Sequence, residues 1–187
     1  MKLRALELQD AYLMVEWMHD ATIVKNMHAN FLDKTEKDCE EFIRCSREDK
    51  NNMHLAIASD DNIYMGTVSL KHIIKNDAAE FGIVVRRQAQ GKGYAKWAME
   101  EIIKIGISKL NLKKIYWCVD PENRRAMGFY DKNNYLQIDK LDRDTVDYLM
   151  KEKYYTLSQI ETYKWYQYSR AKKGNTNRET PYNMEFV

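Results

Sequence analysis

Two short segments carry residue types whose spacing could support chemistry. In the first, Gln88–Ala95, two glycines, Gly91 and Gly93, flank Lys92 immediately before a predicted helix. Glycine lets the backbone approach a ligand closely, and the first turn of a helix leaves N–H groups unpaired at the positive end of the helix dipole. Together these features favour an anion such as a pyrophosphate. The alternative is a glycine turn that only begins a helix.

The spacing of these glycines excludes two widespread phosphate-binding loops. A dinucleotide-binding fingerprint needs a third glycine at the position that Lys96 occupies. A P-loop needs Ser or Thr directly after Gly-Lys, where this chain has Gly93. Any phosphate site here is therefore of another type.

The second segment begins a predicted helix with Asn123 and reaches Tyr130 seven residues later. This spacing puts both residues on one helical face, about two turns apart. Asn123 could bond to a polar ligand chain. Because a tyrosine has an unperturbed pKa of about 10 and a thiol about 8.5, a neutral Tyr130 could protonate a leaving thiolate. The alternative is an amphipathic helix whose tyrosine is packed in the core.

Bulk composition excludes several classes of partner. The 187 residues are 44% hydrophobic and 31% charged, and the net charge is +2, which is globular composition without the basic excess typical of nucleic-acid or membrane-surface binding. No apolar run approaches the ~20 residues of a membrane span, and the N-terminus has no signal core. Three cysteines without CxxC spacing indicate reduced thiols, and no histidine pair has metal-ligand spacing. We expect a cytoplasmic protein without a metal; a homodimer is left open.

The elements that must position these two segments follow from hydrophobic periodicity. The sequence predicts a short opening strand near Leu3, a helix from Gln9, an irregular stretch over Asp20–Leu32 and a helix after Thr35. Three strands separated by turn residues then form an antiparallel meander. Their expected ranges are His54–Ala58, Ile63–Ile74 and Ala78–Val85.

The second half of the chain reads as strand–helix–strand–helix and therefore contains a parallel pair. The expected elements are a helix over Gly93–Leu110, a strand over Lys114–Val119 and a short helix over Asn123–Asn133. Later strands are expected at Leu136–Asp139 and Thr162–Tyr168, whereas Thr145–Leu157 fits either helix or strand. We predict one α+β domain over residues 1–170 and a polar tail over residues 171–187.

Taken together, the two segments resemble signatures of the GCN5-related N-acetyltransferases. Gln88-x-x-Gly91-x-Gly93 is similar to the family's pyrophosphate motif, and Asn123-x-x-Ala126-x-x-Phe129-Tyr130 is similar to its second motif. The stretch Ala79–Val85 resembles the family's fourth strand. The start of the chain, Leu8–Asp20 with Glu16-Trp17-Met18-His19-Asp20, is similar to the ribosomal-protein alanine acetyltransferase-like branch and to enzymes acting on nucleotide-linked amino sugars. Asn134-Tyr135 departs from the common Gly-Phe, but Asn also tolerates the left-handed backbone.

The resemblance implies a GNAT fold, with a mixed sheet of about seven strands, and acetyl-CoA as co-substrate. The main chain of Ile83, Val84 and Val85 would hold the pantetheine arm, with a backbone N–H near Val84 stabilising the oxyanion. The N–H groups of the loop would hold the pyrophosphate, together with Asn123 and Tyr130 along the arm. The loop residues are Gln90, Gly91, Lys92, Gly93, Tyr94 and Ala95.

The resemblance also implies direct attack by an amine that must first lose a proton. Glu80 is the expected proton acceptor, with a surface strand carboxylate as the alternative, and Tyr130 is the expected proton donor. The four histidines are rival bases, although each could equally be a surface or packing residue: His19, His28, His54 and His72.

The expected function is acetyl transfer to the primary amine of a small molecule such as a nucleotide-linked amino sugar. Basic and aromatic groups support this acceptor, among them Arg44, Lys71, Arg124 and a tyrosine-rich stretch over Tyr154–Tyr168. That stretch is expected mainly as core packing and otherwise as a stacking wall. A polyamine, an aminoglycoside or a protein N-terminus is an alternative acceptor, and a non-catalytic CoA-binding module is an alternative function.

Overall fold

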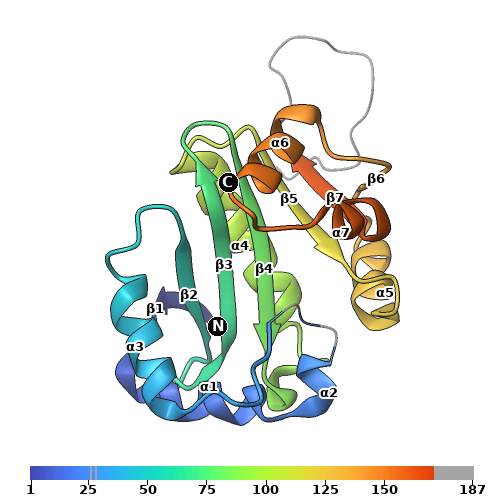
Figure 1. The fold of residues 1–187 in the computed structure, drawn as a ribbon. Helices are drawn as coiled ribbons and strands as arrows, with labels where there is room; N and C mark the ends of the chain where they lie inside the picture. The colour runs from blue at the N-terminus through green and yellow to red at the C-terminus, as the bar shows by residue number, and fades with distance from the viewer. Residues whose placement is uncertain (26, 28, 171–187) are drawn as a thin grey trace.

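The computed structural model describes residues 1–25, 27 and 29–170, and the predicted tail over residues 171–187 lies outside this range, as does His28. The centre of the fold is a seven-stranded mixed sheet in the order β1-β2-β3-β4-β5-β7-β6 (Figure 1). The strands are β1 (Lys2–Ala5), β2 (Met53–Ala58), β3 (Tyr64–Ile74), β4 (Ala78–Val85), β5 (Lys114–Val119), β6 (Gln137–Ile138) and β7 (Lys164–Ser169).

The expected meander and parallel pair are both confirmed. Strands β1 to β4 are antiparallel neighbours, and β4 pairs with β5 in parallel. The turns between the meander strands contain Asn62 and Asn76 with φ of 65° and 59°, a left-handed conformation that asparagine tolerates. The last strand, β7, lies between β5 and β6 and is antiparallel to both.

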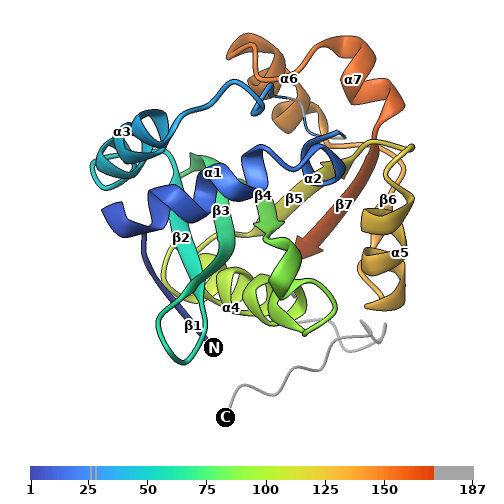
Figure 2. The same cartoon turned by 90° about the horizontal axis from the view of Figure 1, so that it is seen from below.

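Helices cover both faces of the sheet (Figure 2). The 15-residue helix α4 (Tyr94–Ser108) and α5 (Arg124–Lys132) pack on one face, with Met99 and Ile102 of α4 fully buried against Leu70 and Ile115. The other face carries helices from both ends of the chain. These are α1 (Ala11–Met18), α2 (Ala21–Val24), α3 (Glu36–Ser46), α6 (Arg143–Lys151) and α7 (Leu157–Thr162), with short 3₁₀ turns η1 (Leu8–Asp10) and η2 (Arg87–Ala89).

One segment differs from what the pattern indicated, and the structure decides one that the pattern left open. The stretch expected to be irregular, Asp20–Leu32, contains α2, whose first turn is capped by the Asp20 side chain accepting from the Thr22 N–H. The ambiguous stretch over Thr145–Leu157 is helical at its start, where Asp142 caps α6, and a capping box at Thr156 begins α7. Between the two helices Lys153 has φ 58°, so the chain cannot continue as one helix.

Side chains of β4 alternate between the two faces, as a strand requires. Ala79 and Phe81 pack in the core beneath α4, whereas Ala78 contacts the cluster of α6 and Val84 the cluster of α1. Glu80 and Gly82 therefore lie on the face opposite α4, between the amino-terminal and carboxy-terminal helices.

Candidate active site

The parallel pairing of β4 with β5 is short. It joins Ala78–Glu80 to Lys114–Tyr116, after which β4 continues to Val85 paired with β3. The Arg86 N–H donates to the Met65 carbonyl of β3, and backbone groups of successive strand residues point to opposite neighbours. The backbone groups of Ile83 and Val85 therefore face the β5 side, and those of Val84 face β3. Ile83 and Val85 offer donors and acceptors to an extended ligand chain.

The glycine loop begins α4 in the way that an anion site requires. Gly91 and Gly93 have φ of 75° and 84°, and Gly93 is the residue that caps α4. A Cβ added at either glycine would meet no atom within 4 Å, so the outer side of the loop is open. The N–H groups of Tyr94 and Ala95 belong to the first helical turn and have no intrahelical acceptor.

The side chains of the glycine loop differ in burial and in their contacts with the rest of the protein. Gln90 is half-buried, and its Nε2 donates to the Val85 carbonyl at 3.4 Å, which ties the loop to the end of β4. Lys92 is exposed beside the two glycines. Tyr94 packs partly against the core cluster beneath the sheet. The loop therefore presents backbone and one flexible cation to solvent, while its neighbours fix its position.

Helix α5 packs Tyr130 on β5 just beyond the residues that pair with β4. Tyr130 is buried, and its ring lies 5.4 Å from Trp117, the residue after the last paired position of β5. Burial, with the nearby Cys118, raises the pKa of the Tyr130 hydroxyl, so this group is neutral at physiological pH. Asn123 is the N-cap of α5, and its Oδ1 accepts from the Ala126 N–H at 3.1 Å.

Glu80 is a buried carboxylate with two basic partners. Its side chain accepts from Lys71 Nζ through Oε1 at 2.5 Å and from His72 Nδ1 through Oε2 at 3.0 Å. Burial by itself would raise the pKa of the Glu80 carboxyl, but the hydrogen bond from His72 and the charge of Lys71 outweigh it and lower the pKa to about 2. Glu80 is therefore ionised, and both of its oxygens are engaged.

The other described histidines do not reach Glu80. His54 Nδ1 lies 2.7 Å from Ser69 Oγ, and burial lowers the pKa of this imidazole. His19 Nε2 lies 2.8 Å from the Lys34 carbonyl. The structure thus brings His72 alone of these three against the carboxylate on β4.

Two further ion pairs connect the amino-terminal helices to the end of β4, and sequence reasoning missed them. Arg86 is buried, donates to the Tyr64 carbonyl at 2.8 Å and lies 2.7 Å from Glu16 on α1. Arg87 follows directly and binds Asp20 at 2.7 Å. Charged residues that follow a strand signal an anchor of this kind only weakly, because their partners lie about 70 residues earlier.

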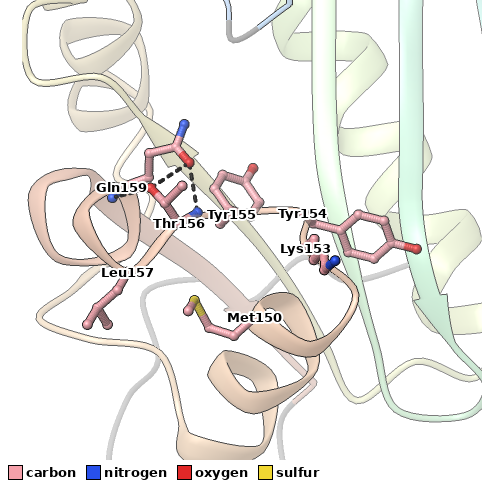
Figure 3. Close-up of a pocket in the computed structure, with 7 residues that line it drawn as sticks. All are labelled: Met150, Lys153, Tyr154, Tyr155, Thr156, Leu157 and Gln159. Carbon is pink, nitrogen blue, oxygen red and sulfur yellow. Dashed lines mark hydrogen bonds between the residues drawn. The ribbon is translucent and has the colours of Figure 1, made fainter.

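The tyrosine-rich stretch over Tyr154–Tyr168 contains both buried and exposed aromatic side chains. Trp165 and Tyr166 are 2% and 0% exposed and pack in the sheet, as expected. Tyr154 is 41% exposed, and its ring stacks on His72 with centroids 3.6 Å apart. Tyr154 and Tyr155 also line a cavity of about 350 Å³ between α6 and α7, together with Met150, Leu157 and Gln159 (Figure 3).

Among the described residues, no group of three His, Cys, Asp or Glu side chains is placed to hold a metal ion. In the same residues no helix combines the length and apolar character needed to cross a membrane.

The known proteins that this chain resembles are N-acetyltransferases. The Acetyltransferase (GNAT) domain family matches residues 1–135. An uncharacterized N-acetyltransferase, p20 of Bacillus licheniformis, is 32% identical over 125 residues, which is 65% of this chain and 70% of that protein. The spermidine N(1)-acetyltransferase of Escherichia coli K12 is 38% identical over 65 residues, about a third of each chain (35% and 34%). The crystal structure of spermidine N-acetyltransferase from Vibrio cholerae with CoA and spermine covers 90% of this chain and 94% of its own, with a TM-score of 0.70 and 22% identity.

Proposed function

Because the chain belongs to the acetyltransferase (GNAT) family, whose co-substrate is acetyl-CoA, we propose that it acetylates the primary amine of a small molecule by direct transfer. One observation carries this proposal. The parallel pairing of β4 and β5 ends at Glu80 and Tyr116, after which β4 runs on toward the open glycine loop, while the buried Tyr130 packs on Trp117 of β5.

Binding of acetyl-CoA would use backbone more than side chains. Ile83 and Val85 would pair with the amides of the pantetheine arm, as an added strand does. The N–H groups of Gly91, Gly93, Tyr94 and Ala95 would bind the pyrophosphate at the positive end of α4, whereas the Lys92 N–H already donates to the Ala89 carbonyl and its side chain would add a charge at the rim. Asn123 already caps α5 through its Oδ1, so only its Nδ2 would be available to the ligand.

The chemistry needs one group that takes a proton and one that gives one. The amine nitrogen attacks the acetyl carbon, the C–S bond then breaks, and CoA leaves as a thiolate. A tyrosine that is neutral at physiological pH is a suitable donor to this thiolate. Burial keeps the Tyr130 hydroxyl protonated, so it can donate a hydrogen bond to the developing thiolate as the C–S bond breaks.

The charged side chains around the site favour a neutral or anionic acceptor, such as a nucleotide-linked amino sugar. Three carboxylates around the site are each matched by a cation: Glu80 by Lys71, Glu16 by Arg86 and Asp20 by Arg87. A site for a polycation would instead present unmatched carboxylates. Exposed Arg124 and the ring of Tyr154 would add a charge and a stacking surface for a nucleotide.

A polyamine is the second candidate acceptor, favoured by the local similarity to spermidine N(1)-acetyltransferase of Escherichia coli. The two acceptors differ in charge, so a direct comparison separates them. Release of CoA from acetyl-CoA should be measured with a nucleotide-linked amino sugar, with spermidine and with a peptide bearing a free N-terminus.

The proposal expects turnover with a small amine and the highest kcat/KM on the amino sugar. A higher kcat/KM with spermidine would indicate that the acceptor is a polyamine and would leave the proposed acetyl transfer unchanged. Turnover restricted to the peptide would indicate a protein N-terminal acetyltransferase. Tight acetyl-CoA binding without CoA release from any amine would make the protein a CoA-binding module and contradict the proposed function.

A further inference from the structure

Strand β3 contains one extra residue opposite β4. Lys71 pairs with Glu80 and Ile74 with Ala78, so His72 and Ile73 together face Ala79. At this β-bulge His72 adopts a left-handed conformation, with φ 52°, in a position that usually takes glycine. Such a conformation is unfavourable for a non-glycine residue. It is held here by Asn52, whose Oδ1 accepts from the His72 N–H at 2.9 Å.

The bulge changes the face on which His72 lies. In a regular strand, successive side chains point to opposite faces, so His72 would point away from Lys71 and toward α4. Instead Ile73 packs against the core cluster beneath α4, and His72 joins Lys71 and Glu80 on the opposite face. A strained position next to a buried carboxylate is typical of functional sites rather than of plain strands.

The partners of the imidazole fix which nitrogen carries the proton. An ionised carboxylate only accepts hydrogen bonds, so His72 Nδ1 must donate to Glu80. In the neutral ring this leaves a lone pair on Nε2, the form that a base requires. The ring plane is fixed by Tyr154, which stacks on it at an interplanar angle of 11°, while 16% of the His72 side chain remains exposed.

The charged and titratable groups around His72 come from three elements. Lys71 lies on its own strand and Glu80 on β4, while Tyr154 follows α6 and contacts Tyr148 of that helix. Because Glu80 bonds directly to the ring, it controls the tautomer.

We propose that His72 takes the proton of the attacking amine, oriented by Glu80 and held in plane by Tyr154; this rests on the proposed function. As the nitrogen bonds to the acetyl carbon, its proton passes to His72 Nε2. The C–S bond then breaks, and the thiolate leaves with the electron pair and is protonated by Tyr130. His72 releases its proton to water, and the Tyr130 phenolate regains one from water. Glu80 is a positioning residue, because Lys71 and His72 engage both of its oxygens.

The test compares the pH dependence of turnover among matched variants. His72→Asn removes the imidazole but keeps a residue that tolerates the left-handed backbone. Its kcat should fall about 100-fold, the usual contribution of general base catalysis. The fall of kcat/KM toward acid pH that an imidazole base produces should disappear. His54→Gln, which removes a histidine bonded to Ser69, should leave both unchanged.

The role of Glu80 is tested by Glu80→Gln, which removes the charge and keeps the size. The imidazole then loses the ionised acceptor that orients it, so kcat should fall while acetyl-CoA affinity is retained. Nitrogen NMR of the His72 ring gives a readout without turnover. The proposal expects the tautomer protonated on Nδ1, and a neutral ring protonated on Nε2 would overturn the dyad.

The outcomes distinguish this inference from the proposed function. If the unaltered protein turns over an amine and His72→Asn keeps normal kcat with the same acid limb, the role of His72 is wrong and the function stands. If the unaltered protein binds acetyl-CoA but acetylates no amine, both are wrong. Circular dichroism and thermal unfolding of each variant confirm that a loss of kcat is not a loss of fold.

Discussion

Glu80 on β4 and Tyr116 on β5 form the last pair of the parallel part of the sheet. Glu80 is 3% exposed and Tyr116 is fully buried, so the point where the two strands separate is fixed by interior side chains. The backbone of Ile83 and Val85 beyond this pair is thereby held in place before any ligand binds. A site formed in advance loses less conformational entropy on binding than one that must be ordered.

Tyr116→Phe tests one side of this pair. The Tyr116 hydroxyl is buried and has no hydrogen-bond partner among the described residues, and burial raises its pKa. A buried polar group without a partner is costly, so its removal should leave stability unchanged or raise it by about 1 kcal/mol. Urea unfolding of both proteins measures this. A loss of more than about 1 kcal/mol would mean that the hydroxyl has a partner, such as a bound water.

Glu80→Gln tests the other side through the pH dependence of stability. The folded pKa of about 2 lies below the ordinary value of about 4.3, so ionised Glu80 stabilises the fold above that ordinary value. This contribution, on the order of 3 kcal/mol, is lost as pH falls from about 4.3 toward 2. The difference in unfolding free energy between wild type and variant should be largest near pH 7 and shrink at pH 3. A difference independent of pH would contradict the depressed pKa.

Gly91→Asp and Gly91→Asn together test the glycine loop. Asp and Asn both tolerate the left-handed backbone, and a Cβ at this position meets no atom within 4 Å, so both variants should fold. They differ in charge alone, and the Asp carboxylate would repel the pyrophosphate. We expect calorimetry to show acetyl-CoA binding at least about 10-fold weaker with Asp than with Asn, a gap that narrows at high salt. Equal affinities would show that the pyrophosphate lies elsewhere.

The sequence was sufficient to predict elements whose signals are local. The strand Lys114–Val119 and the left-handed turn at Asn134 are confirmed, since dense β-formers and a helix-ending asparagine act locally. The placement of β7 between β5 and β6 depends on pairing over about 50 residues, which no local pattern encodes. The same holds for Arg86 and Glu16, whose partnership exists only after folding.

The position of His72 shows why the site was harder to predict than the fold. Strict alternation from Lys71 puts His72 on the α4 face, and the extra residue that reverses this is visible only in the register with β4. The expected proton acceptor, Glu80, lies near the site, but its burial and its two partners could not be read from composition. Its role as a base therefore gives way to our proposal that it orients His72.

Tyr130→Phe tests the proton donor, with Tyr166→Phe as its control. The two rings lie 5.0 Å apart in one core cluster, and the Tyr166 hydroxyl donates to Asp131 at 3.1 Å. Tyr130→Phe keeps the packed ring, so stability should change by about 1 kcal/mol or less. It removes the donor to the leaving thiolate, so kcat should fall by about 100-fold if C–S cleavage limits the rate. The KM for acetyl-CoA should hardly change, because this interaction develops in the transition state.

Tyr166→Phe should show the opposite pattern, because its hydroxyl stabilises the fold through Asp131. We expect a loss of about 1 kcal/mol in unfolding free energy with kcat unchanged. Single-turnover measurements with saturating acetyl-CoA separate the chemical step from product release in both variants. If Tyr130→Phe keeps normal single-turnover rates on the best amine, the thiolate takes its proton from water and Tyr130 is a packing residue. If both variants lose the same activity, the effect comes from the shared cluster, because only Tyr130 is expected to donate to the thiolate.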